Sequence, residues 1–139
     1  MSPSPHEFTW PIRVYYEDTD MQGVVYYANY FRFMERARTE WIRTLGIEQD
    51  AFLREHRRLF VVVETQAEFH QPARFNDQLA VTVELQDRSR ASFLLRQRIF
   101  RDTPDGALLC NGSVRAACIN ADTSKPARLP DLLFEEQTP

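Results

Sequence analysis

Lysine is almost absent from this sequence, and long apolar runs are missing altogether. Lys125 is the one lysine among 17 basic residues, which are outnumbered by 20 acidic residues, so the formal net charge is −3 at pH 7. A weakly acidic chain argues against a general nucleic-acid-binding function. No apolar run exceeds five residues, which is too short for a membrane span. The Pro- and Ser-rich start leads into no apolar segment, so we expect no signal peptide.

Cysteine and histidine are also scarce. Cys110 and Cys118 are the only two cysteines, and they lie too far apart in one predicted strand to be bridged within it. We interpret them as reduced core thiols, which favours a cytoplasmic protein. The three histidines are scattered, and none has a cysteine or carboxylate at ligand spacing, so we predict no metal site and no cofactor. The sequence also lacks the Gly-x-Ser-x-Gly motif of a serine nucleophile.

A long amphipathic helix is predicted between Asn29 and Leu45. Apolar residues recur there at the i, i+3, i+4, i+7 spacing of one helix face. They are Tyr30, Phe33, Met34, Ala37, Trp41 and Leu45. Asn29 can cap the start of this helix, and Gly46 can end it. A second, short helix is expected at residues 48–55.

Five segments have the composition or alternation of β-strands. They are residues 8–16, 59–71, 78–86, 90–101 and 107–120. Pro11 in the first segment suggests an edge strand or an irregularity. In the second segment we expect one face to carry Val61, Val63, Thr65, Ala67 and Phe69. One face of the last segment consists mostly of small residues, which predicts that a bulky side chain packs against it.

The predicted order is one strand, the long helix, a short helix and four strands joined by short turns. Adjacent antiparallel strands need a cover on their apolar face, and the long helix is the obvious candidate. The sequence therefore predicts an α+β fold, with one antiparallel sheet of about five strands wrapped around a central helix. We expect a single domain over residues 1–139, with residues 1–7 and about 131–139 as flexible tails.

An acidic loop, Glu17–Gly23, directly precedes the long helix and is the candidate active site. Asp20 is either an ordinary turn carboxylate or a catalytic group. The segment from Tyr27 to Tyr30 should offer the free N–H groups of a helix N-terminus, which can stabilise a developing oxyanion. A carboxylate beside such a helix end suits acyl transfer or ester hydrolysis.

The sequence resembles the hot-dog-fold acyl-CoA thioesterases at these residues. The likeness lies in Val14–Asp20 and Gly23–Tyr30, and it continues through Glu35–Glu40, Pro72–Asp77 and Pro126–Pro130. The most similar branches are 4-hydroxybenzoyl-CoA thioesterase and the Tol–Pal-associated acyl-CoA thioesterases of bacteria. The second branch commonly has His where this chain has Tyr27, whereas the first branch has Tyr there.

The resemblance implies hydrolysis of acyl-CoA thioesters, with Asp20 as the catalytic acid of the motif. Asp20 would act either as a nucleophile or as a general base. Asp18 would support it, either through loop hydrogen bonds or by influencing its charge. Gly23 would allow an unusual backbone conformation or close approach of the substrate. Tyr27 would either offer its backbone N–H to the thioester carbonyl or pack as an aromatic residue on the helix start.

Several alternatives stay open at this point. Asn29 is either a helix cap or a substrate ligand. Arg88 and Arg90 either form a solvated turn or bind the phosphates of CoA. An acyl carrier protein could replace CoA as the acyl donor. The rival functions are a hot-dog hydratase or dehydratase and a non-catalytic acyl-CoA-binding or envelope-associated module. The resemblance further implies a homodimer or tetramer with sites shared between chains.

Overall fold

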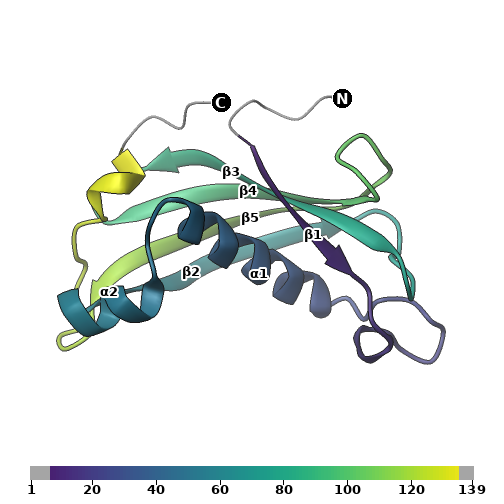
Figure 1. Ribbon diagram of the computed structural model, residues 1–139, viewed down its shortest axis with the longest axis horizontal. Coiled ribbons are helices and arrows are strands. Elements are labelled where there is room, and N and C mark those ends of the chain that lie inside the picture. Colours follow the sequence, from purple (N-terminus) through teal and green to yellow (C-terminus); the bar gives the residue numbers. More distant parts are fainter. Residues whose placement is uncertain (1–6, 135–139) are drawn as a thin grey trace.

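The computed structural model describes residues 7–134, and these residues form one sheet and two α-helices (Figure 1). In chain order the elements are β1 (Phe8–Arg13), the 3-10 helix η1 (Tyr16–Asp18), α1 (Asn29–Thr44), α2 (Gln49–His56), β2 (Arg58–Phe69), β3 (Gln78–Arg88), β4 (Ser92–Arg101), β5 (Leu108–Asn120) and the 3-10 helix η2 (Asp131–Phe134). The predicted order of elements is confirmed. The first strand is shorter than predicted, because Tyr16 already belongs to η1.

The sheet is antiparallel, with the strand order β1-β3-β4-β5-β2. The two edge strands differ in length, since β1 has 6 residues and β2 has 12. Pro11 lies in β1, so the prediction that it marks an edge strand is confirmed. A proline is tolerated there because an edge strand has one row of backbone groups outside the sheet's hydrogen bonds.

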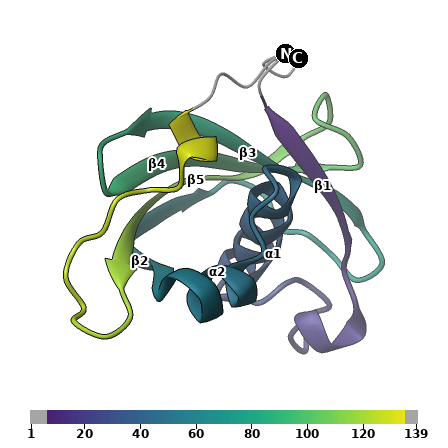
Figure 2. The same ribbon diagram turned by 60° about the vertical axis from the view of Figure 1, so that its left-hand side comes forward.

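Helix α1 lies inside the curve of the sheet, with β1 on one side and β2 on the other (Figure 2). Its 16 residues are only slightly more than the average for a globular protein. The predicted apolar face is buried, apart from the half-buried Leu45, and Ile42 joins it. Gly46 follows the helix with φ +89, the left-handed conformation that favours glycine at a helix end.

The small-residue face of β5 makes room for Met34 of α1. A Cβ atom built on Gly112 would lie 3.1 Å from the Met34 Cε atom and 2.7 Å from the backbone oxygen of Gln66. The prediction that a bulky side chain packs against this face is therefore confirmed. Glycine at this position lets the helix approach the sheet closely.

A β-bulge changes the predicted face of β2. Cα pairing with β5 skips Val63, so Val62 lies opposite Ala116 and Glu64 lies opposite Arg115. Residues directly opposite each other share a face, and the bulge therefore reverses the alternation. The prediction is correct for Thr65, Ala67 and Phe69 but wrong for Val61 and Val63, because Phe60 and Val62 take the helix-facing positions before the bulge.

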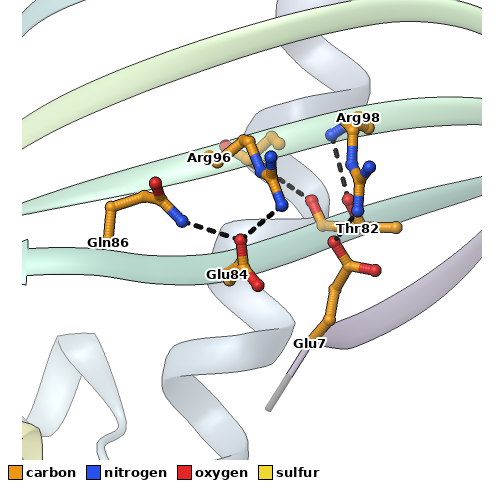
Figure 3. Close-up of polar contacts among 7 residues, drawn as sticks. Glu7, Thr82, Glu84, Gln86, Arg96 and Arg98 are labelled. Atoms are coloured by element: carbon orange, nitrogen blue, oxygen red, sulfur yellow. Dashed lines mark hydrogen bonds and ion pairs between the residues drawn. The ribbon is translucent and has the colours of Figure 1, made fainter. Parts of the chain in front are cut away.

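The outer face of the sheet, away from α1, carries two ion pairs (Figure 3). Arg96 contacts Glu84 at 2.8 Å, and Arg98 contacts Glu7 at 2.7 Å. Both pairs lie over β3 and β4, where Glu84 and Arg96 are direct cross-strand partners. Opposite charges at such positions stabilise the pairing of the two strands.

Two residues of the predicted tails are buried in the structure. Glu7 has a fully buried side chain, and Leu133 in η2 is also fully buried. Leu133 therefore belongs to the core, which the irregular composition of that segment did not indicate. The remainder of both predicted tails lies outside the described residues. None of the helices in the described part of the chain is long and apolar enough to cross a membrane.

Candidate active site

Asp18 holds the loop between β1 and α1 in place. Its side chain is 8% exposed, and one carboxylate oxygen accepts the backbone N–H of Tyr15 at 2.8 Å. Its backbone oxygen accepts the N–H of Tyr26 at 3.1 Å and the side-chain amide of Asn29 at 2.9 Å. These contacts connect the acidic loop directly to the start of α1. Asp18 is thus a structural support of the loop in this arrangement.

Asp20 lies at the exposed tip of the same loop. Its backbone N–H donates to Val24 O at 2.9 Å, and its carboxylate accepts the N–H of Gln22 at 2.9 Å. Gly23 closes the turn with φ +76, and no atom lies within 4 Å of a Cβ built on it. Glycine is therefore required for its backbone angle rather than for space. The loop leaves the Asp20 carboxylate accessible.

The loop between β2 and β3, which contains Ala73, is hydrogen-bonded both to α1 and to the segment that follows the acidic loop. Val25 donates its N–H to Ala73 O at 2.8 Å, and Ala73 donates its own N–H to the Tyr30 hydroxyl at 2.9 Å. Tyr30 is 3% exposed, and burial raises the pKa of its phenol. Helix α1, the Pro72–Asn76 segment and the acidic loop are thereby joined through Ala73.

The N-terminus of α1 differs in detail from the prediction. Ala28 is the N-cap residue and makes no side-chain cap hydrogen bond, so the interpretation of Asn29 as the cap is wrong. The N–H groups of Asn29 and Tyr30 are also not free, because they donate to Tyr26 O and Tyr27 O at 2.8 and 3.2 Å. Within residues 7–134, the backbone N–H groups of Tyr27 and Ala28 have no hydrogen bond. Among the described residues, the open donors of the predicted Tyr27–Tyr30 segment are therefore those of its first two residues, and the last two are bonded.

The Tyr27 ring packs where the helix starts. Its centroid lies 4.8 Å from that of Tyr26 and 6.1 Å from that of Phe69 in β2. A hydrogen bond with Tyr27 is the main cause that raises the pKa of the Tyr26 phenol. The two interpretations of Tyr27 are compatible, because its ring makes aromatic contacts while its backbone N–H stays open.

The electrostatic field at this helix end favours negative charge. The first turn of α1 contains no acidic residue that would offset the positive end of the helix dipole. Open N–H groups at such an end can bind an anion or stabilise a developing oxyanion. The site thus combines an accessible carboxylate with donors for an oxyanion. A cysteine nucleophile does not fit, because Cys110 and Cys118 are both buried and burial raises the pKa of both thiols, that of Cys110 to about 12.

Arg88 and Arg90 lie at the other end of the sheet. Arg13 at the end of β1 pairs with Gln78 at the start of β3, and Arg88 ends β3. A strand of that length spans roughly 35 Å. Figure 1 shows β3 running from the end with the acidic loop to the opposite end. The structure therefore does not bring Arg88 and Arg90 together with Asp20 within one chain.

Sequence analysis missed one polar pair beneath α1. Gln97 interrupts the apolar face of β4 and is fully buried, and its side-chain oxygen accepts a hydrogen bond from the Arg38 guanidinium at 3.0 Å. Arg38 lines a cavity of about 180 Å³ between α1, α2 and β2. A glutamine between Leu95 and Ile99 was the signal that could have revealed this feature.

Comparisons with known proteins agree with this arrangement. The thioesterase-like superfamily model matches residues 14–136. The acyl-CoA thioesterase YbgC of Haemophilus influenzae is 41% identical over 123 residues, which are 88% of this chain and 88% of that protein. The probable thioesterase from Bartonella henselae is 31% identical with a TM-score of 0.82, and the match covers 89% of this chain and 99% of that chain. This chain belongs to the thioesterase-like superfamily.

A further solved structure bears on the fold alone. The 1,4-dihydroxy-2-naphthoyl-CoA thioesterase Slr0204 from Synechocystis has a TM-score of 0.85 at 24% identity, covering 92% of this chain and 93% of that chain. The five-stranded antiparallel sheet around one helix is shared with these thioesterases. The expected hot-dog fold is confirmed.

Proposed function

We propose that this protein hydrolyses acyl-CoA thioesters to a free acid and CoA. One observation carries the proposal: the exposed Asp20 carboxylate lies on a loop bonded to a helix start whose Tyr27 and Ala28 N–H groups are open. The relatives that share most of the chain's length have names that specify the same reaction.

In the proposed mechanism, the thioester carbonyl oxygen points at the Tyr27 N–H. Negative charge develops on that oxygen during attack, and the helix end stabilises it. Asp20 either attacks the carbonyl carbon or removes a proton from the attacking water. Asp18, Gly23 and Asn29 hold the loop and the helix in their relative positions.

An acyl-CoA panel with a thiol reagent tests this function. The purified protein should release the free thiol of CoA. A parallel measurement with acyl carrier protein thioesters shows which acyl donor is preferred. A hydratase or dehydratase would change the acyl group without releasing thiol. A binding module would retain acyl-CoA and release nothing, and either result would reject hydrolysis.

The assembly we propose is a homodimer, or a tetramer built from dimers, joined along β2. This edge strand has apolar side chains that α1 covers only in part or not at all, with Val62 at 49%, Val63 at 56% and Phe69 at 47% exposure. An isologous pairing of two β2 strands reverses the direction of the second protomer. The end that carries Asp20 would then lie beside the partner end that carries Arg88 and Arg90, so CoA could contact both chains.

Sedimentation of matched edge variants tests the assembly. Val62→Asp places a charge on the proposed interface and should yield monomers, whereas Thr9→Asp on the β1 edge should leave the assembly intact. A monomeric wild-type protein at micromolar concentration would reject the proposed dimer and, with it, the shared site.

A cytoplasmic location is proposed from the two free, buried cysteines. The substrate class fits this location. The proposed connection with the Tol–Pal proteins is supported only by the resemblance of the loop and the helix. Fractionation of cells that produce the protein, followed by immunodetection, tests the location.

A further inference from the structure

The buried pair beneath α1 has features that packing alone does not explain. Gln97 occupies a core-facing position of β4 and is fully buried. Its amide donates to Met34 O at 2.9 Å and to Thr82 O at 3.4 Å, and its oxygen accepts from Arg38. A buried amide is costly unless it is hydrogen-bonded. Gln97 is fully bonded here, and one of its bonds fixes the position of a guanidinium.

Arg38 has no ion-pair partner within residues 7–134. Arg38 is half-buried, and the one hydrogen bond it makes with the described residues is to the neutral side chain of Gln97. Burial lowers the pKa of Arg38, and the nearby Glu35 partly offsets this. Arginine nevertheless stays charged in proteins. A charge that is partly removed from water and has no counter-charge is unfavourable, which points to a ligand that supplies one.

The cavity at Arg38 has mostly apolar walls. Phe60, Val62, Phe93, Ala116 and Ile42 supply these walls, and the polar lining includes Arg38, Glu35, Thr39 and Gln49. Glu35 is exposed and does not approach Arg38 closely enough to form an ion pair. An apolar pocket with one positioned cation suits a ligand that has an apolar body and an anionic end.

One stripe of α1 connects this cavity with the candidate active site. Phe31, Glu35 and Arg38 recur at i, i+4 and i+7, which places them on one helix face. Phe31 and Tyr27 both contact Phe69 of β2, with ring centroids 6.4 and 6.1 Å apart. The rise from Tyr27 to Arg38 is about 16 Å along the axis, and the long side chain points back toward the N-terminus. An extended acyl group bound at Tyr27 could therefore reach the guanidinium.

We propose that Arg38 is a specificity-determining residue that binds a carboxylate at the far end of the acyl group. The preferred substrates would be CoA thioesters of medium-length dicarboxylic acids, and the product would be the free dicarboxylic acid. This inference rests on the proposed thioesterase function. Gln97 would act as a positioning residue, since it contacts Arg38 rather than the substrate.

Two thioesters of equal chain length, octanoyl-CoA and suberoyl-CoA, isolate the contribution of the terminal carboxylate. We expect wild-type protein to have the higher kcat/KM with suberoyl-CoA, and this preference should decline with ionic strength. Arg38→Gln should lower the ratio of suberoyl to octanoyl kcat/KM about tenfold or more, the scale of a lost charge-assisted contact. Arg36→Gln, on the exposed side of the same helix, should leave the ratio unchanged.

A substitution at Glu35 should change the ratio of suberoyl to octanoyl kcat/KM in the opposite direction. Glu35→Gln removes a negative charge from the cavity lining and should raise the ratio, because less repulsion then acts on the substrate carboxylate. This residue is exposed, so the variant is expected to fold even if Arg38→Gln does not. Thermal melting and sedimentation of every variant establish that fold and assembly are retained.

The failure of this inference is distinguishable from failure of the proposed function. Release of CoA from neither thioester would reject the thioesterase. Hydrolysis of both with no wild-type preference for suberoyl-CoA would overturn the inference and leave the thioesterase in place. The inference is also overturned if Arg38→Gln dissociates the protein while the ratio of suberoyl to octanoyl kcat/KM stays constant. The guanidinium would then bind a carboxylate of the second copy and not the substrate.

Discussion

The polar groups of the core beneath α1 are buried and hydrogen-bonded, whereas the acidic loop and the adjoining helix start have polar groups that are exposed or open. In the core, Gln97 and the Tyr30 hydroxyl are buried and hydrogen-bonded. At the loop, the Asp20 carboxylate is exposed, and the Tyr27 N–H has no partner in the described part of the chain. Bonded polar groups stabilise the fold, whereas open ones are available to a substrate. Substitutions in the two regions should therefore affect different properties.

The largest expected effect is on turnover by the loop variant Asp20→Asn. Asn is nearly isosteric but is a poor base and a poor nucleophile, so kcat should fall about a hundredfold or more. The melting temperature should change little, because the side chain is exposed and Asn can still accept the Gln22 N–H. Asp18→Asn should lose less activity, because its carboxylate supports the loop. Near-normal turnover by folded Asp20→Asn would refute the assignment of Asp20.

Single turnover in isotopically labelled water separates the two roles of Asp20. Label that enters the Asp20 side chain supports a covalent anhydride intermediate. Label that appears only in the product acid in the first turnover supports direct attack by water.

In the core, Gly112→Val should lower stability and leave chemistry nearly intact. The new side chain would meet the Gln66 backbone oxygen and the Met34 side chain. Overpacking of this kind costs about 1–3 kcal/mol of unfolding free energy. Denaturant unfolding measures the loss, and Ser113→Ala on the outer face is the control, expected within about 0.5 kcal/mol of wild type. Equal stability of the two variants would contradict the close packing of α1 on β5.

Tyr30→Phe tests the connection between the two regions. It removes the acceptor of the Ala73 N–H and leaves that buried donor without a partner, at a cost of about 1 kcal/mol or somewhat more. A modest loss of kcat should accompany it, because Ala73 also accepts the N–H of Val25, which follows the acidic loop. Tyr26→Phe, an exposed tyrosine, is the control for stability. Wild-type stability of Tyr30→Phe would show that the contact does not support the loop.

The smallest effect is expected at the far end of the sheet. Arg90→Ala should raise KM for acyl-CoA about two- to fivefold, the scale of an exposed charge pair, with little change in kcat. Contacts to phosphate act equally in the ground and transition states. Arg54→Ala in α2 removes an exposed arginine elsewhere and should leave KM unchanged. An unchanged KM for Arg90→Ala would remove Arg90 from the proposed CoA site.

Local patterns were sufficient to predict most of the fold. The spacing of apolar residues predicted α1 to within one residue at its C-terminal end, and the small side chains of β5 predicted a bulky neighbour, which the structure identifies as Met34. The face of β2 was mispredicted, because a bulge at Val63 depends on pairing with β5 and has no signal within the strand itself. The start of α1 at Asn29 was predicted correctly, but its cap was not, since Ala28 is the N-cap residue and the Asn29 side chain bonds to Asp18 across the loop.

The sequence by itself determined the order of elements, the buried face of α1 and the position of the acidic loop, because these depend on neighbours along the chain. Only the tertiary structure decided which groups meet. In the folded chain Gln97 is hydrogen-bonded to Arg38, 59 residues away in the sequence, and Arg90 lies the length of β3 away from Asp20. Such relations depend on strand register and on the packing of α1, and no pattern within a single segment encodes either of them.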